Sequence, residues 1–557
     1  VPTMKLISYL SALVVYVCLP ALSVADHPTD KLGQKLGTIR FEVSGSDAAR
    51  EQVVRGVKLL HHMMYVEADR EFAAAITADP DCALAYWGRA MTMIRPLWSD
   101  SPTAAELKQG LEFVRTGLAR NPKTARERDY LQVLESYCDQ TPSKGYPAGL
   151  KILDEGWGQL ATKYPKDLDA AAFSALFHLA PARFVAKDKS HRIQLEAAQT
   201  IQQVLAQIPD HPGAQHYKIH AYDFPMLADR ALEICESYGA IAPDVPHALH
   251  MPTHIYTRRG LWEKSIDFNR RSADAARKIN EQAGEIVLHY PHALDYLVYA
   301  YLQRGQYQAA NAIREEVLAL PGPYHAANRS GIAFALAAIP ARYTLERHDW
   351  AGATQLKLHQ PASFPWSAAA LHCDSIVHFA RAIGAVRSGQ LDMARSEIQQ
   401  LEELNRKISA AYSVSYWVSQ AETQLLAARG WLKLKEGDAE NALALMRRAT
   451  ELETKADKEA VTPGEVLPAG ELLGDMLAEL KRPADALAAF EAVLVSSPNR
   501  LNSLYGAARS AETAGDIRKA TQYYRELTKL VEAADPGVRG LQDAKAFLAR
   551  SVSLRRE

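Results

Sequence analysis

The chain has 557 residues, of which 48% are hydrophobic and 23% are charged, and such a composition is typical of a soluble globular protein. The 64 basic and 65 acidic residues give a formal net charge of -1, and no block of basic residues stands out. This balance argues against nucleic acid as a partner. The sequence also lacks a glycine-rich phosphate loop, a Cys-x2-Cys pair and a Gly-x-Ser-x-Gly elbow, which argues against nucleotide use, haem attachment and serine hydrolysis.

Residues 1–25 have the pattern of a secretory signal peptide. Lys5 precedes an apolar run from Leu6 to Leu19, and Ser23-Val24-Ala25 offers a small-x-small cleavage site. The apolar run is short for a membrane span, so an N-terminal anchor is the weaker alternative, as is a lipoprotein at Cys18. We therefore expect an exported protein, periplasmic or secreted, with no membrane span after signal cleavage.

The mature chain is expected to begin with an extended N-terminal arm at residues 26–47. Four cysteines follow over a long chain, which does not make a disulfide framework, although one pair could form in an oxidising compartment. We expect buried free thiols at Cys82, Cys138, Cys235 and Cys373.

A period of 34 residues runs through most of the chain. Near the C-terminus, small, aromatic and proline residues recur at fixed offsets: Gly474, Ala486, Phe490 and Pro498 are followed 34 residues later by Ala508, Ala520 and Tyr524. The same offsets relate Gly56, Ala68, Phe72, Ala75 and Pro80, and a spacing of 34 separates Ala197, Ala231 and Ser265. Small residues at such positions let paired helices approach closely, the aromatic fills the space between repeats, and proline stops the second helix.

This pattern resembles the tetratricopeptide repeat (TPR) family from Ala48 to Leu530. The phrases Asp79-Pro80-Asp81-Cys82-Ala83 and His247-Ala248-Leu249-His250 are also similar to a group of exported bacterial TPR proteins. The resemblance implies an all-α, right-handed superhelical solenoid of about nine to twelve repeats. We divide it into an N-terminal TPR-like array with a histidine-rich groove at 48–360, a C-terminal TPR array at 361–534 and a capping helix at 535–557.

The most unusual feature is the placement of histidines within this repeat. In TPR proteins, the second, fifth, ninth and twelfth residues of the first helix face the concave groove. The template residues Ala231, Ser265 and Ala310 fix the register of three consecutive repeats. The groove positions are then His216, His220 and Asp223 in the first, His247, His250 and His254 in the second, and His292, Asp295 and Tyr299 in the third.

Histidines and aspartates on one stripe of neighbouring helices favour a transition-metal site, because residues three, four and seven apart share a helix face. We expect zinc, copper or iron on some of His216, His220, Asp223, His247, His250, His254, His292 and Asp295. No Glu follows the first histidine of a pair, so the H-E-x-x-H metalloprotease signature is absent, and Asp223 or Asp295 would be the candidate base. Tyr299 and Arg258 are candidates for orienting an anionic ligand, and Trp87 lies on another predicted groove helix, where core packing also explains it.

Three functions fit these features. The first is an exported scaffold that binds a peptide, protein or small ligand in its groove, with the metal site at its centre. The second is a metal-dependent hydrolase or oxidoreductase, and the third is metal storage or delivery in the periplasm. A metal-free polar groove, histidines with scattered structural roles, and a separate copper site at His61-His62-Met63-Met64 are the remaining alternatives.

Overall fold

A computed structural model describes residues 35–98, 101–184, 190–326, 329–367, 370–411, 416–456 and 458–553. The predicted signal peptide at residues 1–25 lies outside these ranges. Within them, no helix has both the length and the apolar character needed to cross a membrane.

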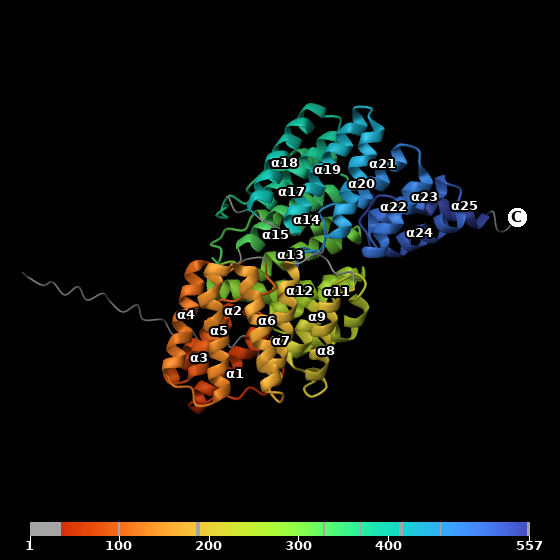
Figure 1. The fold of residues 1–557 in the computed structure, drawn as a ribbon. Helices are drawn as coiled ribbons and strands as arrows, with labels where there is room; N and C mark the ends of the chain where they lie inside the picture. Colours follow the sequence, from red (N-terminus) through yellow and green to blue (C-terminus); the bar gives the residue numbers. More distant parts are fainter. Residues whose placement is uncertain are drawn as a thin grey trace, which may run out of the picture.

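The first half of the chain forms an N-terminal lobe, which Figure 1 draws from red to yellow-green. Its helices are α1 Asp47–His61, α2 Tyr65–Ala78, α3 Ala83–Met91, α4 Ala104–Ala119, α5 Ala125–Lys144, α6 Tyr146–Lys163, α7 Leu168–Leu179, α8 Arg192–Leu205, α9 Pro212–Tyr222, α10 Leu232–Ile241, α11 Pro246–Arg258 and α12 Trp262–Ala283, with short 3-10 helices at Ala180–Phe184 and Ala228–Ala231.

The second half forms a C-terminal lobe, drawn from green to blue (Figure 1). Its helices are α13 His289–Gln303, α14 Tyr307–Leu318, α15 Arg329–Glu346, α16 Trp350–Thr354, α17 Leu371–Arg387, α18 Leu391–Ala411, α19 Tyr416–Lys435, α20 Ala439–Lys455, α21 Ala469–Glu479, α22 Pro483–Ser496, α23 Leu501–Thr513, α24 Ile517–Leu530 and α25 Leu541–Ser553. The described residues contain no strand, only a single bridge between Ile286 and Tyr324.

Consecutive helices pack as hairpins from α1–α2 to α23–α24, and α25 packs on the last of them. The first helices of successive hairpins also contact one another, for example α9 with α11, α11 with α13, and α13 with α15. Pairs of helices stacked in this way are the TPR-like solenoid that the 34-residue period predicts. The stacking continues through α13, α15 and α17 across residue 360, and α25 is the helix at the C-terminal end of the array.

Glycine–phenylalanine contacts explain why this sequence folds into tightly packed hairpins. A Cβ atom added at Gly56 would lie 2.7 Å from the ring of Phe72, and one at Gly88, in the next repeat, would lie 2.3 Å from the same ring. Gly474 has the same relation to Phe490, at 2.7 Å. The aromatic ring therefore occupies the space that two glycines leave between neighbouring repeats, as the template positions predict.

The solenoid curves tightly enough for distant repeats to meet. Helix α1 contacts α9, four repeats later, and α13 contacts α23, five repeats later. The concave side is consequently not an open groove along its whole length. At the middle of the chain it is filled by other parts of the same molecule.

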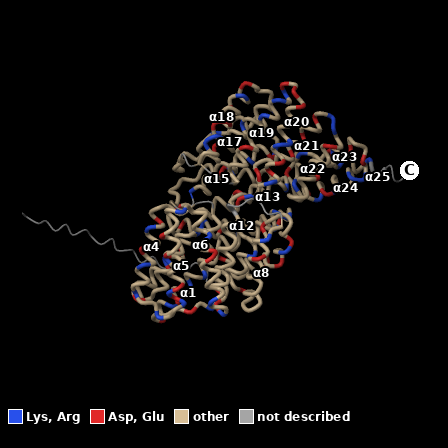
Figure 2. The backbone as a smooth tube through the Cα atoms, in the orientation of Figure 1, with Lys and Arg blue, Asp and Glu red and all other residues tan. Residues whose placement is uncertain are grey.

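Two hydrophobic clusters make up the interior, one for each lobe. The first includes Ala248 and Ile255 of α11, and the second includes Ala293 and Leu297 of α13. All four cysteines in the described residues are buried and free, which confirms that prediction. Acidic and basic residues are mixed over both lobes (Figure 2).

Candidate functional site: two three-histidine groups

Three successive inner helices carry the predicted histidines. Helix α9 holds His216 and His220, α11 holds His247, His250 and His254, and α13 holds His292. Pro212 and Pro246 occupy the first turns of α9 and α11, where a missing N–H removes no helical hydrogen bond. Helix α11 also runs without interruption through Pro252. The helical stripes expected from the spacing are therefore formed and face one another.

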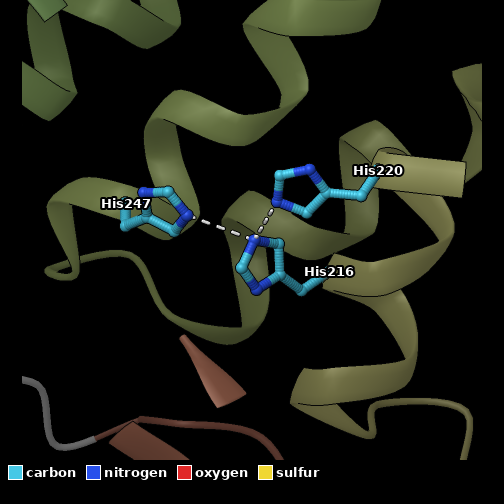
Figure 3. Close-up of side chains that lie close together, drawn as sticks. All are labelled: His216, His220 and His247. Atoms are coloured by element: carbon cyan, nitrogen blue, oxygen red, sulfur yellow. Dashed lines mark hydrogen bonds between the residues drawn. The ribbon is translucent and has the colours of Figure 1, made fainter. Parts of the chain in front are cut away.

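The first group, called site 1, consists of His216, His220 and His247 (Figure 3). The Nε2 atom of His216 lies 3.1 Å from Nε2 of His220 and 3.1 Å from Nε2 of His247. One nitrogen of each ring lies within 4.8 Å of the others. The three rings thus point their nitrogens at a common centre.

The second group, called site 2, consists of His250, His254 and His292, whose ligand nitrogens also lie within 4.8 Å of one another. Nε2 of His250 is 3.0 Å from Nε2 of His254, and the rings of His250 and His292 are 4.2 Å apart between centroids. Sites 1 and 2 are adjacent, because the rings of His220 and His254 are 6.2 Å apart and those of His247 and His250 are 6.4 Å apart. We call the two sites together the six-histidine centre.

Hydrogen bonds on the other side of the rings decide which nitrogen carries the proton. Nδ1 of His216 lies 2.6 Å from the backbone carbonyl oxygen of His61, which can only accept, so Nδ1 is the donor. Nδ1 of His254 likewise donates to a carboxylate oxygen of Asp223, at 2.9 Å. Neutral imidazole has one N–H, so the Nε2 atoms of both rings carry a lone pair.

The same reasoning holds for His250. Its Nδ1 lies 2.8 Å from the side-chain oxygen of Asn269. The amide nitrogen of Asn269 donates to the backbone oxygen of Ser265 at 2.9 Å, which fixes the amide orientation and makes its oxygen the acceptor for His250. The lone pair of His250 is therefore also on Nε2.

In site 2, the Nε2 atoms of His250 and His254 therefore lie 3.0 Å apart, and both carry a lone pair with no proton between them. Two lone pairs at this distance repel, whereas a shared cation turns the contact into an attraction. Two nitrogens bound tetrahedrally at the usual zinc–nitrogen length are about 3.3 Å apart. The measured separations of 3.0 Å and 3.1 Å in the two sites are close to this value.

Burial keeps the six imidazoles neutral. Removal from water lowers the pKa of each ring, to about 3 for His216 and well below the usual value for His220, His247, His250 and His292. Burial also lowers the pKa of His254, although Asp223 opposes the shift. At neutral pH protons do not compete with a metal ion for these nitrogens.

The two predicted aspartates lie outside the groups of three. Asp223 contacts His254, Arg258 at 2.9 Å and Lys458 at 3.1 Å, so it orients a ligand ring. Burial alone would raise its pKa, but Lys458 and Arg258 outweigh burial and hold the pKa well below its usual range. Asp295 pairs instead with the buried Arg342, at 3.2 Å.

The residues predicted to bind a further ligand are engaged within the protein. Arg258 pairs with Asp223, and the hydroxyl of Tyr299 accepts a hydrogen bond of 2.7 Å from Arg500. Trp87 is fully buried and packs in the aromatic interior, 5.4 Å from the ring of Tyr130. None of these three side chains borders the six-histidine centre on an open surface.

A segment from the C-terminal lobe covers site 2. The hydroxyl of Tyr296 lies 3.0 Å from the carbonyl oxygen of Thr462 and 3.2 Å from that of Ala460, and it is 3.4 Å from Nε2 of His254. Lys458, only 3% exposed, reaches Asp223 from the same segment. Of the six histidines only His220 is partly exposed, and the others are buried. We call residues 458–466 the covering segment.

A third group has metal-ligand spacing but a different arrangement of protons. It consists of His61, Asp169 and His211, and we call it the Asp169 cluster. Nδ1 of His211 accepts the backbone N–H of Ala214, so its proton is on Nε2, which lies 3.4 Å from Asp169. Nε2 of His61 donates to the same oxygen of Asp169 at 2.9 Å, while its Nδ1 accepts from the hydroxyl of Tyr217. Both rings present N–H groups to the carboxylate.

Comparisons with known proteins find distant structural likeness only. No protein-family model and no curated protein matches the chain. Among solved structures, the chain is similar to the human IFIT1 dimer with m7Gppp-AAAA, at 13% identity over 89% of this chain and 92% of that chain, with a TM-score of 0.36. It is also similar to the APC/C hetero-tetramer Cut9–Hcn1, at 12% identity over 91% of this chain and 96% of that chain, with a TM-score of 0.30. Both likenesses are too distant to bear on the function of this chain.

Proposed function

We propose that this protein is a metal-binding TPR-like scaffold that holds one transition-metal ion in each of its two three-histidine sites. The observation that carries the proposal is the contact between His250 and His254. Their Nδ1 partners place both lone pairs on Nε2, at a separation of 3.0 Å that a cation between them would explain. Zinc, copper and iron all accept imidazole ligands, and copper(II) has the highest affinity among them.

The outer hydrogen bonds support a built site rather than a chance cluster. A backbone carbonyl, an amide oxygen and a carboxylate orient His216, His250 and His254 respectively. Partners of this kind fix the tautomer and the ring orientation of histidines that bind metals.

Elemental analysis tests the proposal. The full chain would be purified without a histidine tag or chelator, dialysed to equilibrium against zinc, and compared with His247→Ala, His254→Ala and the double variant. We expect about two zinc ions per chain in the parent, about one in each single variant and none in the double variant, because three histidines form each site. His178→Ala is the matched control, since His178 pairs with Asp154 and Glu196 away from the centre.

Two results would refute the proposal. One is a parent protein that takes up no zinc, copper or iron while folded. The other is a folded double variant that retains the metal content of the parent, which would place the ions elsewhere.

A metal-dependent enzyme is the second candidate, favoured by the number of ligands. Three histidines leave one position of a tetrahedral ion open, as in catalytic zinc sites, whereas structural sites use four protein ligands. The cobalt(II) form would be titrated with azide. A change in its visible spectrum would indicate an open position, and an unchanged spectrum in a fully loaded protein would indicate a closed, structural site.

A peptide or protein partner remains part of the proposal for the scaffold. The covering segment lies over site 2, so a partner would have to displace residues 458–466 to touch those histidines. We also propose export, because of the signal-like pattern of residues 1–25.

A further inference from the structure

A cavity of about 420 Å³ opens beside site 1. Trp98, His289, Met63 and His325 are among its lining residues. The ring of Trp98 stacks on that of His247 at 5.8 Å and meets the ring of His289 edge-on at 5.8 Å. The cavity wall is thus in direct contact with a site 1 histidine.

His289 lies between this cavity and site 1. It begins α13, one turn before His292, and its ring is 5.5 Å from that of His247. Within the described residues, neither ring nitrogen of His289 has a hydrogen-bond partner. A half-buried imidazole without a hydrogen-bond partner, beside a three-histidine site, has a lone pair free for a cation.

The charges that line the cavity are balanced, so its wall does not repel a hydrated cation. Asp69 pairs with Arg89 at 2.8 Å and Arg95 pairs with Glu106 at 2.6 Å. The carboxylate of Glu67 and the guanidinium of Arg70 also line the cavity. The indole N–H of Trp98 donates to the sulfur of Met63 at 3.1 Å and thereby holds the ring against His247.

We propose that His289 is a relay ligand, which takes a divalent transition-metal ion from this cavity and passes it to His247 of site 1. The ion arrives hydrated, and each imidazole that binds it displaces one water molecule. No electron is transferred, and no proton is released, because the imidazoles are already neutral. This inference rests on the proposed function, since it requires that site 1 binds metal.

Uptake kinetics of cobalt(II) test the relay in the full chain. The protein would be stripped with a chelator, mixed with cobalt(II) and followed by visible absorption, which changes as nitrogen ligands replace water. We expect His289→Ala to slow uptake about tenfold, which corresponds to about 1.4 kcal/mol in the barrier, while the final cobalt content stays equal to that of the parent. His325→Ala is the matched control, because His325 lines the same cavity and pairs with Glu285 at 3.7 Å, and its uptake rate should equal that of the parent.

A second variant tests the cavity without changing a histidine. Met93 lines the cavity, and Met93→Trp would fill part of it, so uptake should again slow with the final content preserved. Circular dichroism would confirm that each variant is folded.

Three outcomes would overturn the relay. The first is a folded His289→Ala variant that takes up cobalt at the rate of the parent, and the second is the same result for folded Met93→Trp. The third is a lower final cobalt content in His289→Ala, which would make His289 a permanent ligand. A folded parent protein that takes up neither cobalt nor zinc, copper or iron would instead refute the proposed function, and the relay with it.

Discussion

The six-histidine centre and the Asp169 cluster are both buried groups with metal-ligand spacing, yet they differ in where their protons lie. In the six-histidine centre, acceptors on the outer side of His216, His250 and His254 leave the lone pairs of these three rings pointing inward. In the Asp169 cluster, His211 accepts a backbone N–H and His61 accepts a hydroxyl hydrogen, so both rings point N–H groups at the carboxylate. The number of nearby histidines is therefore a weaker guide to a metal site than the second hydrogen-bond partner of each ring.

The largest expected effect concerns the Asp169 cluster. Asp169→Ala should lower the free energy of unfolding by about 2–6 kcal/mol, because the buried N–H groups of His61 and His211 then no longer face a carboxylate, at about 1–3 kcal/mol each. Urea unfolding would measure the loss. The zinc content of the folded variant should stay at the parental value, and a loss of zinc would show that this cluster is part of the metal centre.

Acid should destabilise the metal-free protein through histidines of both regions. Burial lowers the pKa of His61 to about 4, whereas an unfolded histidine has a pKa of about 6.5. Between these pH values the unfolded chain binds a proton that the folded chain does not, so stability falls as the pH drops. This imidazole alone contributes a loss of about 3 kcal/mol at pH 4. Urea unfolding at pH 7, 6, 5 and 4 would measure this loss. A free energy of unfolding that stays constant over this range would contradict the claim that these histidines are buried in the uncharged form.

Zinc should stabilise the protein only through the six-histidine centre. At a free zinc concentration 100 times the dissociation constant, each site should add about 2.7 kcal/mol to the free energy of unfolding. The His247→Ala/His254→Ala double variant should gain nothing, although its Asp169 cluster is intact. Thermal or urea unfolding with and without zinc would distinguish the two regions. If zinc raised the free energy of unfolding of the double variant as much as that of the parent, zinc would not be acting through the six-histidine centre.

The smallest expected effect is a loss of zinc affinity on removal of Asn269, the hydrogen-bond partner of His250. Asn269→Ala removes the acceptor that holds the proton of His250 on Nδ1, so zinc affinity at site 2 should weaken about tenfold. Competition with a zinc chelator would measure both sites, and site 1 serves as the internal control. Unchanged affinity at site 2 would show that the ring is oriented without Asn269.

The sequence predicts much of this structure because the relevant information is local. The 34-residue period gives the helical hairpins, and the template alanines place the histidines on neighbouring inner helices without knowledge of the chain's curvature. The spacing between Gly56 and Phe72 likewise identifies a contact that is present.

Contacts that depend on curvature could not be predicted. The bond from Lys458 to Asp223 joins residues 235 positions apart, and the bond from His216 to the carbonyl of His61 spans 155 positions. No periodic signal marks Asn269 as a neighbour of the centre, whereas His289 lies three residues before His292 and shares its helix face. Trp87, by contrast, packs in the aromatic core, which is one of the two positions that the sequence allowed.

The order of the chain gives the covering segment a role in assembly. All six histidines lie between residues 216 and 292, whereas the covering segment begins at residue 458. During synthesis from the N-terminus, the ligands are therefore complete well before their cover exists. The growing chain therefore passes through a stage in which the histidines of site 2 are made but not yet covered, and site 2 can be covered only after residues 458–466 have been synthesised.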